Sequence, residues 1–166
     1  MIQYAEECRA LDIPYIFDPG QQCARMSGVE LRDGIVGARV VICNDYEFEL
    51  IRQKSEMGED DVLKVADVLI VTRGEEGSSI YQGSARVDVK AVPPTRIVDP
   101  TGVGDAFRGG LMKGLAGGAS YQASARLGSV AATYALEHLG GQSHAYSLAE
   151  FSARHEEHFG ALPAFA

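Results

Sequence analysis

Apolar and polar positions follow two different periods along the chain, and the switches between them predict alternating helices and strands. Apolar residues recur every three or four positions in six ranges, namely 2–11, 45–55, 59–66, 105–118, 120–141 and 147–159. Short apolar runs typical of buried strands lie at 13–18, 38–44, 67–72 and 95–99. This order predicts an α/β fold with a mostly parallel sheet.

Local signals refine several of these elements. Residues 78–92 alternate around Gln82-Gly83-Ser84, which predicts a hairpin. Asn44 or Asp45 is a suitable N-cap for the helix that follows. Ser147 precedes Glu150 by three residues, the spacing of a capping box. Pairs of glycines at 117–118 and 140–141 are expected to end two helices.

A polar residue stands where each of four predicted strands ends: Asp18, Asn44, Thr72 and Asp99. In parallel sheets, ligands bind beyond the carboxyl ends of the strands. Strand ends are also exposed, and exposed positions are polar without any ligand. Both explanations stay open on this pattern alone.

The stretch "IVDPTGVGDAF" places a glycine-rich turn directly before a predicted helix. Gly102 and Gly104 allow backbone N–H groups to approach a ligand, since no Cβ intervenes. The first N–H groups of a helix lack partners and carry a partial positive charge, so they suit phosphate. Alternatively, the turn only begins a helix with Asp105 as its N-cap. Three further glycines within the following helix, Gly109, Gly110 and Gly114, favour close packing or close ligand approach.

Two common phosphate-binding patterns are absent. No lysine follows the glycines before Lys113, so the turn is not a Walker loop. The dinucleotide pattern fails because Phe107 stands at its last glycine position. A Rossmann dehydrogenase is therefore disfavoured.

Composition narrows the class of protein. The 166 residues predict a single domain over 1–166, and the formal net charge of −8 argues against nucleic-acid and membrane partners. Three cysteines without paired spacing fit a reducing compartment, and no secretory signal is present at the start of the sequence. These features predict a cytoplasmic enzyme or binding domain.

Three motifs, in this order, resemble those of the ribokinase-like (PfkB) carbohydrate and nucleoside kinases: "NDYEFELI", "VTRGEEGSSIY" and "DPTGVGDAFRGG". Val103 replaces the alanine more common in the last motif. With "FDPGQQ", the motifs are most similar to the bacterial adenosine kinase branch. The resemblance implies a three-layer α/β/α, ribokinase-like fold. It covers only the C-terminal half of that fold, so the N-terminal half and the β lid are absent from this sequence.

The resemblance also implies catalytic roles. Asp105 would be the base that takes the proton from the acceptor hydroxyl, which attacks the γ-phosphate of ATP. The backbone N–H groups of Gly102, Val103 and Gly104 would stabilise the transferring phosphoryl group.

The cofactors implied are ATP and Mg²⁺, and in some members of the family K⁺. The resemblance assigns Thr72, Gly74 and Gly77 to ATP, Asn44 and Glu47 to Mg²⁺ through water, Ser129 to the adenine side, and Asp99 to a monovalent cation. Five of these residues also have a structural alternative: a tight turn for Thr72, Gly74 and Gly77, an acid in the first helical turn that complements the helix dipole for Glu47, and tight helix packing for Ser129.

The expected function is transfer of phosphate from ATP to a nucleoside or sugar, with the adenosine 5′-hydroxyl favoured. The alternatives are a ribose- or fructose-type sugar kinase and a nucleotide-binding module without turnover. A sheet edge left open by the absent strands leaves a homo-oligomer possible.

Overall fold

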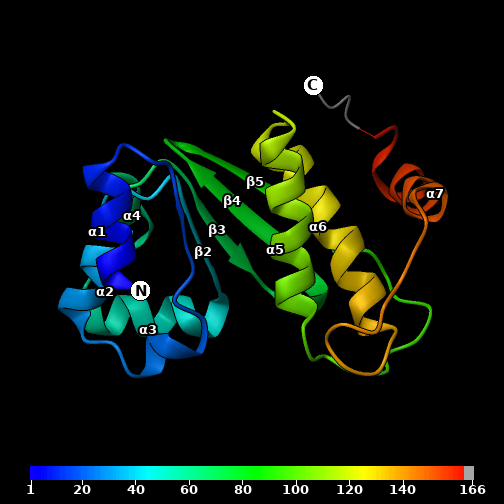
Figure 1. Cartoon of the computed structure of the whole chain (residues 1–166), viewed down its shortest axis with the longest axis horizontal. Helices are drawn as coiled ribbons and strands as arrows, with labels where there is room; N and C mark the ends of the chain where they lie inside the picture. The colour runs from blue at the N-terminus through cyan, green and yellow to red at the C-terminus, as the bar shows by residue number, and fades with distance from the viewer. Residues whose placement is uncertain (163–166) are drawn as a thin grey trace. The chain divides into compact units, whose positions relative to one another are not determined.

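Five strands form one sheet in the order β1-β2-β3-β4-β5 within residues 1–162, the part of the chain that this computed structural model describes. The chain divides into two compact units (Figure 1). The first comprises Met1–Arg73 and Ser79–Asp88, and the second comprises Gly74–Ser78 and the residues from Val89 onward.

The first unit holds nearly all of the sheet. Strands β1 (Ile16–Phe17), β2 (Val40–Asn44) and β3 (Leu69–Thr72) are parallel, with Ile16 paired to Val40 and Asn44 paired to Thr72. Strands β4 (Ser78–Gln82) and β5 (Ala85–Val89) are joined by two residues, which confirms the predicted hairpin. The polar ends of β2 and β3 therefore lie at the same edge of the sheet.

Helices of the first unit follow the predicted order, with one addition. They are α1 (Ile2–Ala10), α2 (Gly28–Ile35), α3 (Asp45–Ser55) and α4 (Glu59–Leu63), with a 3₁₀ turn at Gly20–Ala24. Helix α2 is not among the predicted helices, although Ser27 and Glu30 form a capping box at its start. The core of this unit joins the helices to the strands through fully buried aliphatic residues such as Leu31, Ile51 and Leu69.

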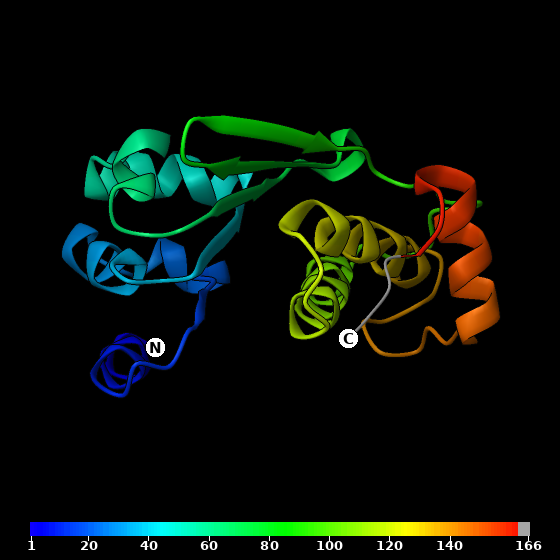
Figure 2. The same cartoon turned by 90° about the horizontal axis from the view of Figure 1, so that it is seen from above.

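The second unit is built on α5 (Val103–Ala116) and α6 (Tyr121–Leu136), which pack along their length (Figures 1 and 2). Helix α7 (Leu148–Phe159) contacts α6, and a short 3₁₀ turn spans Gly74–Glu76. A Cβ added to Gly110 would lie 2.6 Å from the Leu127 carbonyl oxygen, and one added to Gly114 would lie 2.5 Å from Ser124 Oγ. These glycines therefore allow the two helices to approach closely.

The predicted strand at 95–99 is wrong. Its backbone bonds to α6 instead of to a neighbouring strand: Val98 N donates to the Leu136 carbonyl at 2.9 Å, and Thr95 N donates to Glu137 at 2.7 Å. Ile97 is 75 % exposed, so the apolar run is not buried as a strand would be.

Helix ends also differ from the prediction in places. Helix α5 begins at Val103, two residues before Asp105, and its N-cap is Gly102. Helix α6 ends at Leu136, before the glycine pair at 140–141 that was expected to close it. The capping box of Ser147 and Glu150 at α7 is confirmed. Among the helices of the described residues, none has the length and apolar character needed to span a membrane.

Candidate active site

The glycine-rich turn begins α5 in a left-handed conformation at Gly102, where φ is +79°. A Cβ added there would lie 2.6 Å from Cα of Gly141, because the two backbones touch. A side chain is therefore excluded at Gly102 both by conformation and by space. In contrast, the nearest atom to a Cβ added at Gly104 is 3.5 Å away, on the Arg108 side chain.

The first amides of α5 are partly available to a ligand. Val103 N donates to the Pro100 carbonyl at 3.3 Å, and Ala106 N makes the first helical bond to the Gly102 carbonyl. Within the described part of the chain, the amides of Gly104 and Asp105 have no acceptor, and both residues are exposed. Two N–H groups at a positively polarised helix start are therefore open to an anion.

The Asp105 carboxylate lies beside these amides in the first turn of α5. Its side chain is 78 % exposed, and Oδ1 accepts a hydrogen bond from Arg108 Nη2 at 2.5 Å. Arg108 is one turn further along the helix, and its guanidinium lies against Gly104. The negative charge of Asp105 and the positive charge of Arg108 therefore lie next to each other at the start of α5.

Asp99 lies just before the glycine-rich turn and holds it in place through two hydrogen bonds. Oδ1 accepts from Thr101 N at 2.8 Å, and Oδ2 accepts from Gly140 N at 2.8 Å. Hydrogen bonds from Thr101, by side chain and backbone, and from the Gly140 amide lower the pKa of Asp99. The ionised carboxylate therefore ties the turn to the loop after α6, next to the Gly102–Gly141 contact.

In the first unit, Asn44 and Glu47 begin α3 together. Asn44 Oδ1 accepts from Glu47 N at 2.7 Å, and Glu47 Oε2 accepts from Asn44 N at 2.9 Å, a complete capping box. Glu47 is thus an acid in the first turn of α3, as the structural alternative expected, and it also completes a capping box. Its second oxygen, Oε1, has no partner among the described residues, so it remains available at the carboxyl end of β2.

The turn that follows Thr72 requires glycine at Gly77, because the backbone there lies close to another segment of the chain. Thr72 is paired with Asn44 across β2 and β3, so these two predicted residues are brought together within the first unit. In the second unit, Gly77 N donates to the Gly74 carbonyl at 3.1 Å. Gly77 has φ of +93°, and an added Cβ would lie 2.0 Å from the Val89 carbonyl oxygen, whereas one added to Gly74 would meet nothing within 4 Å.

Ser129 holds a neighbouring segment of chain. Its hydroxyl accepts from Val92 N at 3.1 Å and donates to the Lys90 carbonyl at 3.0 Å, and the residue is 6 % exposed. Thr133, one turn later, donates to the Val92 carbonyl at 2.9 Å. With Glu137, these side chains bind the segment that leads into the glycine turn.

Two of these features were missed in the sequence. Ser129, Thr133 and Glu137 are spaced by four among apolar residues at the end of α6, and this periodic polar stripe could have indicated a bound segment. The pairing of Arg108 with Asp105 follows an i, i+3 spacing that is equally visible.

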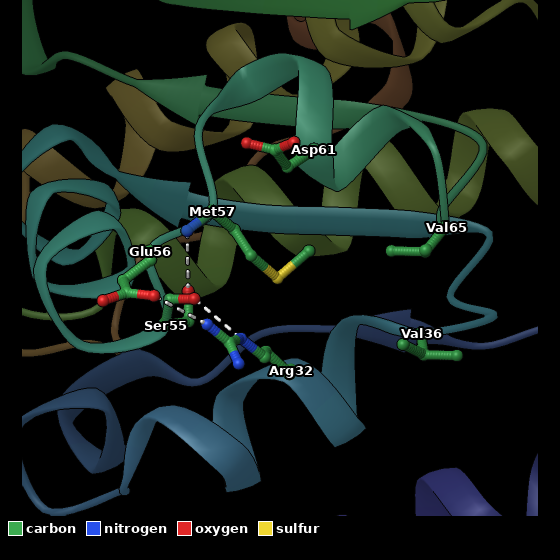
Figure 3. Close-up of a pocket in the computed structure, with 7 residues that line it drawn as sticks. All are labelled: Arg32, Val36, Ser55, Glu56, Met57, Asp61 and Val65. Carbon is green, nitrogen blue, oxygen red and sulfur yellow. Dashed lines mark hydrogen bonds and ion pairs between the residues drawn. The ribbon is translucent and has the colours of Figure 1, made fainter.

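A separate pocket of about 360 Å³ in the first unit carries no comparable chemistry. Figure 3 shows Arg32 turned toward Ser55 and Glu56, where Nε donates to the Ser55 carbonyl at 2.7 Å. Arg32 thereby caps the C-terminal end of α3, the opposite end from Asn44 and Glu47. In the described residues, no group of three or more His, Cys, Asp or Glu could hold a metal directly.

Comparison with known proteins identifies the relatives of this chain. The family model of the pfkB family carbohydrate kinases matches residues 3–147. A nucleoside kinase from Methanocaldococcus jannaschii is 30 % identical over 142 residues, which cover 86 % of this chain and 47 % of that protein. The chain thus spans about half the length of the curated relatives it matches.

Solved structures agree with this likeness. The nucleoside kinase of Burkholderia thailandensis in complex with inosine has a TM-score of 0.94 and 39 % identity, covering 98 % of this chain and 53 % of that one. Its complex with ADP and inosine has a TM-score of 0.95 and 38 % identity, covering 99 % and 52 %. The expected three-layer α/β/α, ribokinase-like fold class is confirmed.

The three motifs that suggested this resemblance, the family match over most of the chain and the similarity of fold lead to one assignment. The chain belongs to the PfkB family of carbohydrate kinases.

Proposed function

We propose that this chain carries the ATP-binding and catalytic half of a kinase that phosphorylates a nucleoside. The observation that supports this most strongly is the turn at Gly102–Asp105, where two amides without acceptors and an exposed carboxylate stand side by side. Nucleoside kinases among the relatives support a nucleoside as the acceptor. Adenosine remains our favoured acceptor, and inosine is the ligand of the similar Burkholderia enzyme.

Each residue of the turn has a role in the proposed reaction. Asp105 accepts the proton of the acceptor hydroxyl while that oxygen forms a bond to the γ-phosphorus. The bond from the γ-phosphorus to the bridging oxygen breaks, and its electron pair stays with ADP. The amides of Gly104 and Asp105 donate to the phosphoryl oxygens as charge shifts, with the turn around Gly102 and Val103 holding them in place.

The residues of the first unit suit a hydrated magnesium ion. Glu47 Oε1 and Asn44 offer oxygen at the carboxyl end of β2, and Mg²⁺ commonly keeps several waters and takes few protein ligands. When bound, Mg²⁺ neutralises charge on the β- and γ-phosphates. Thr72, Gly74 and Gly77 are proposed to contact the phosphates and ribose, and Ser129 to position the segment beside the nucleotide. K⁺ at Asp99 and a cytoplasmic location stay predictions.

A second candidate is a nucleotide-binding module without turnover. It is supported by the two open amides at the start of α5, which suit a nucleotide phosphate whether or not transfer follows. Such a module would bind ATP through the same turn and would transfer no phosphate.

One experiment separates these functions. Transfer of ³²P from γ-labelled ATP to adenosine, inosine, cytidine or ribose is measured alongside ATP binding by calorimetry. The kinase transfers label to a nucleoside, and Asp105→Asn lowers the rate on the order of 10²-fold or more. Binding without transfer to any acceptor supports the module, and absence of ATP binding contradicts both.

A further inference from the structure

The ion pair between Arg108 and Asp105 poses a chemical problem for the proposed reaction. Oδ1 of Asp105 already accepts a hydrogen bond from Arg108 Nη2 at 2.5 Å, so this oxygen is not open to the hydroxyl group of an acceptor. A ligand that draws Arg108 away would leave this carboxylate oxygen open.

The position of Arg108 points to phosphate as that ligand. Its guanidinium lies against Gly104, with Nη1 3.5 Å and Cζ 3.9 Å from the place of an added Cβ, so it stands next to the amides that await an anion. The Arg108 side chain is 33 % exposed, and the Asp105 side chain is 78 % exposed, so both are reachable from solvent. A guanidinium can bind phosphate through two parallel N–H bonds, as it binds carboxylate.

We propose that Arg108 exchanges Asp105 for the terminal phosphate of ATP, so that binding of the triphosphate frees Asp105 to accept the proton. This inference rests on the proposed function and assigns Arg108 as a positioning residue of the same site. ADP lacks the terminal phosphate, so it leaves the ion pair in place. The arrangement keeps the base occupied until the phosphoryl donor has bound.

The test compares ATP and ADP binding in a cycle of variants of the full chain, by calorimetry with Mg²⁺. Arg108→Gln is expected to weaken ATP binding about tenfold and ADP binding less than about twofold. Asp105→Asn is expected to tighten ATP binding several-fold where Arg108 is present, because the Asp105 carboxylate then no longer competes with phosphate for Arg108. In the double variant, this gain disappears.

Two further variants serve as controls. Arg108→Lys keeps the charge without the two parallel donors, so it should recover only part of the ATP affinity. Lys113→Gln removes one positive charge from the last turn of the same helix and should leave the ratio of ATP to ADP affinity unchanged. Circular dichroism melting confirms that each variant is folded.

Several results would overturn the exchange. Equal weakening of ATP and ADP by Arg108→Gln would show general attraction of anions. Equal tightening by Asp105→Asn with and without Arg108 would show simple repulsion between Asp105 and phosphate. A wild-type chain that binds neither nucleotide would contradict both the proposed function and this inference. If the wild type binds both nucleotides and Arg108→Gln leaves the ratio of ATP affinity to ADP affinity unchanged, only the exchange is contradicted.

Discussion

Gly102 and Gly104 flank one residue of the same turn, yet an added methyl group meets different surroundings at each. Gly102→Ala forces a residue with a side chain into φ of +79° and places Cβ 2.6 Å from Gly141, so we expect a loss of about 2 kcal/mol in the free energy of unfolding. Gly104→Ala meets only the flexible end of Arg108 and should change stability by less than about 1 kcal/mol.

Urea denaturation of both variants checks this contrast. The second measurement is ATP binding, where Gly104→Ala should weaken affinity although the protein stays folded, since a methyl group then stands beside the open amides. If Gly104→Ala binds ATP as wild type does, close approach of phosphate to Gly104 is wrong.

For single residues, the sequence predicted which residues form the turn better than it predicted their hydrogen-bond partners. Gly102, Gly104 and Asp105 were identified because glycine spacing and a following helix restrict the backbone strongly. The bond of Val103 N to Pro100 and the pairing of Arg108 with Asp105 depend on how the turn closes and on side-chain rotamers. Neither is determined by spacing alone.

Neighbouring glycines of α5 have opposite surroundings, and this leads to a prediction for the helix pair. Gly110→Ala places Cβ 2.6 Å from the Leu127 backbone, so we expect a loss of about 1–3 kcal/mol from overpacking. Gly109→Ala meets nothing within 4 Å, and alanine favours the helix, so it should add about 0.5–1 kcal/mol.

Thermal and urea unfolding of the two variants give the comparison directly. The variants differ by one position and carry the same added methyl group, so each is the control for the other. Destabilisation of similar size in both would contradict close packing of α5 and α6 at Gly110.

Elements with a strong local signal were predicted, and those that depend on a partner were not. The hairpin at 82–84 and the cap at Ser147 follow from a few adjacent residues. The run at 95–99 has the composition of a strand, but its hydrogen bonds go to α6, which no local pattern of that run reveals. Helix α2 was missed although its capping box is legible in the sequence.

Acid should destabilise the folded chain in two steps. Burial lowers the pKa of His155, so the unfolded state binds this proton first and stability falls below about pH 6.5. Burial alone would raise the pKa of Glu137, but hydrogen bonds from Arg154 and Thr95 outweigh it and the pKa is lowered. A carboxylate whose pKa is lowered by folding stabilises the folded state at pH values above its pKa in the unfolded chain, about 4.3. This contribution is lost as the pH falls below that value.

Urea denaturation at a series of pH values between about 3 and 8, a range that includes the unfolded-state pKa values of both groups, measures both steps. Glu137→Gln leaves Arg154 without its buried carboxylate, so it should cost about 3 kcal/mol at neutral pH and flatten only the lower step. Glu49→Gln, at an exposed pair with Arg52, should cost less than about 0.5 kcal/mol. An undiminished lower step in Glu137→Gln would show that this pair is not its source.

At the scale of the whole molecule, the fold class and family followed from three motifs in order, because each motif fixes a strand end or a helix start. The acceptor could not be predicted in the same way. None of the three motifs specifies an acceptor, and the chain covers only 47 % of the length of the nucleoside kinase from Methanocaldococcus jannaschii.

The central claim is that the start of α5 binds the phosphates of ATP through the amides of Gly104 and Asp105. The most direct measurement is a titration of the ¹⁵N-labelled chain with ATP and Mg²⁺, followed by the amide resonances of these residues. We predict that both amides show large, saturable shifts, while the amide of Ala116, an exposed residue at the end of the same helix, moves little. Saturable ATP binding that leaves the Gly104 and Asp105 amides unshifted would contradict the account.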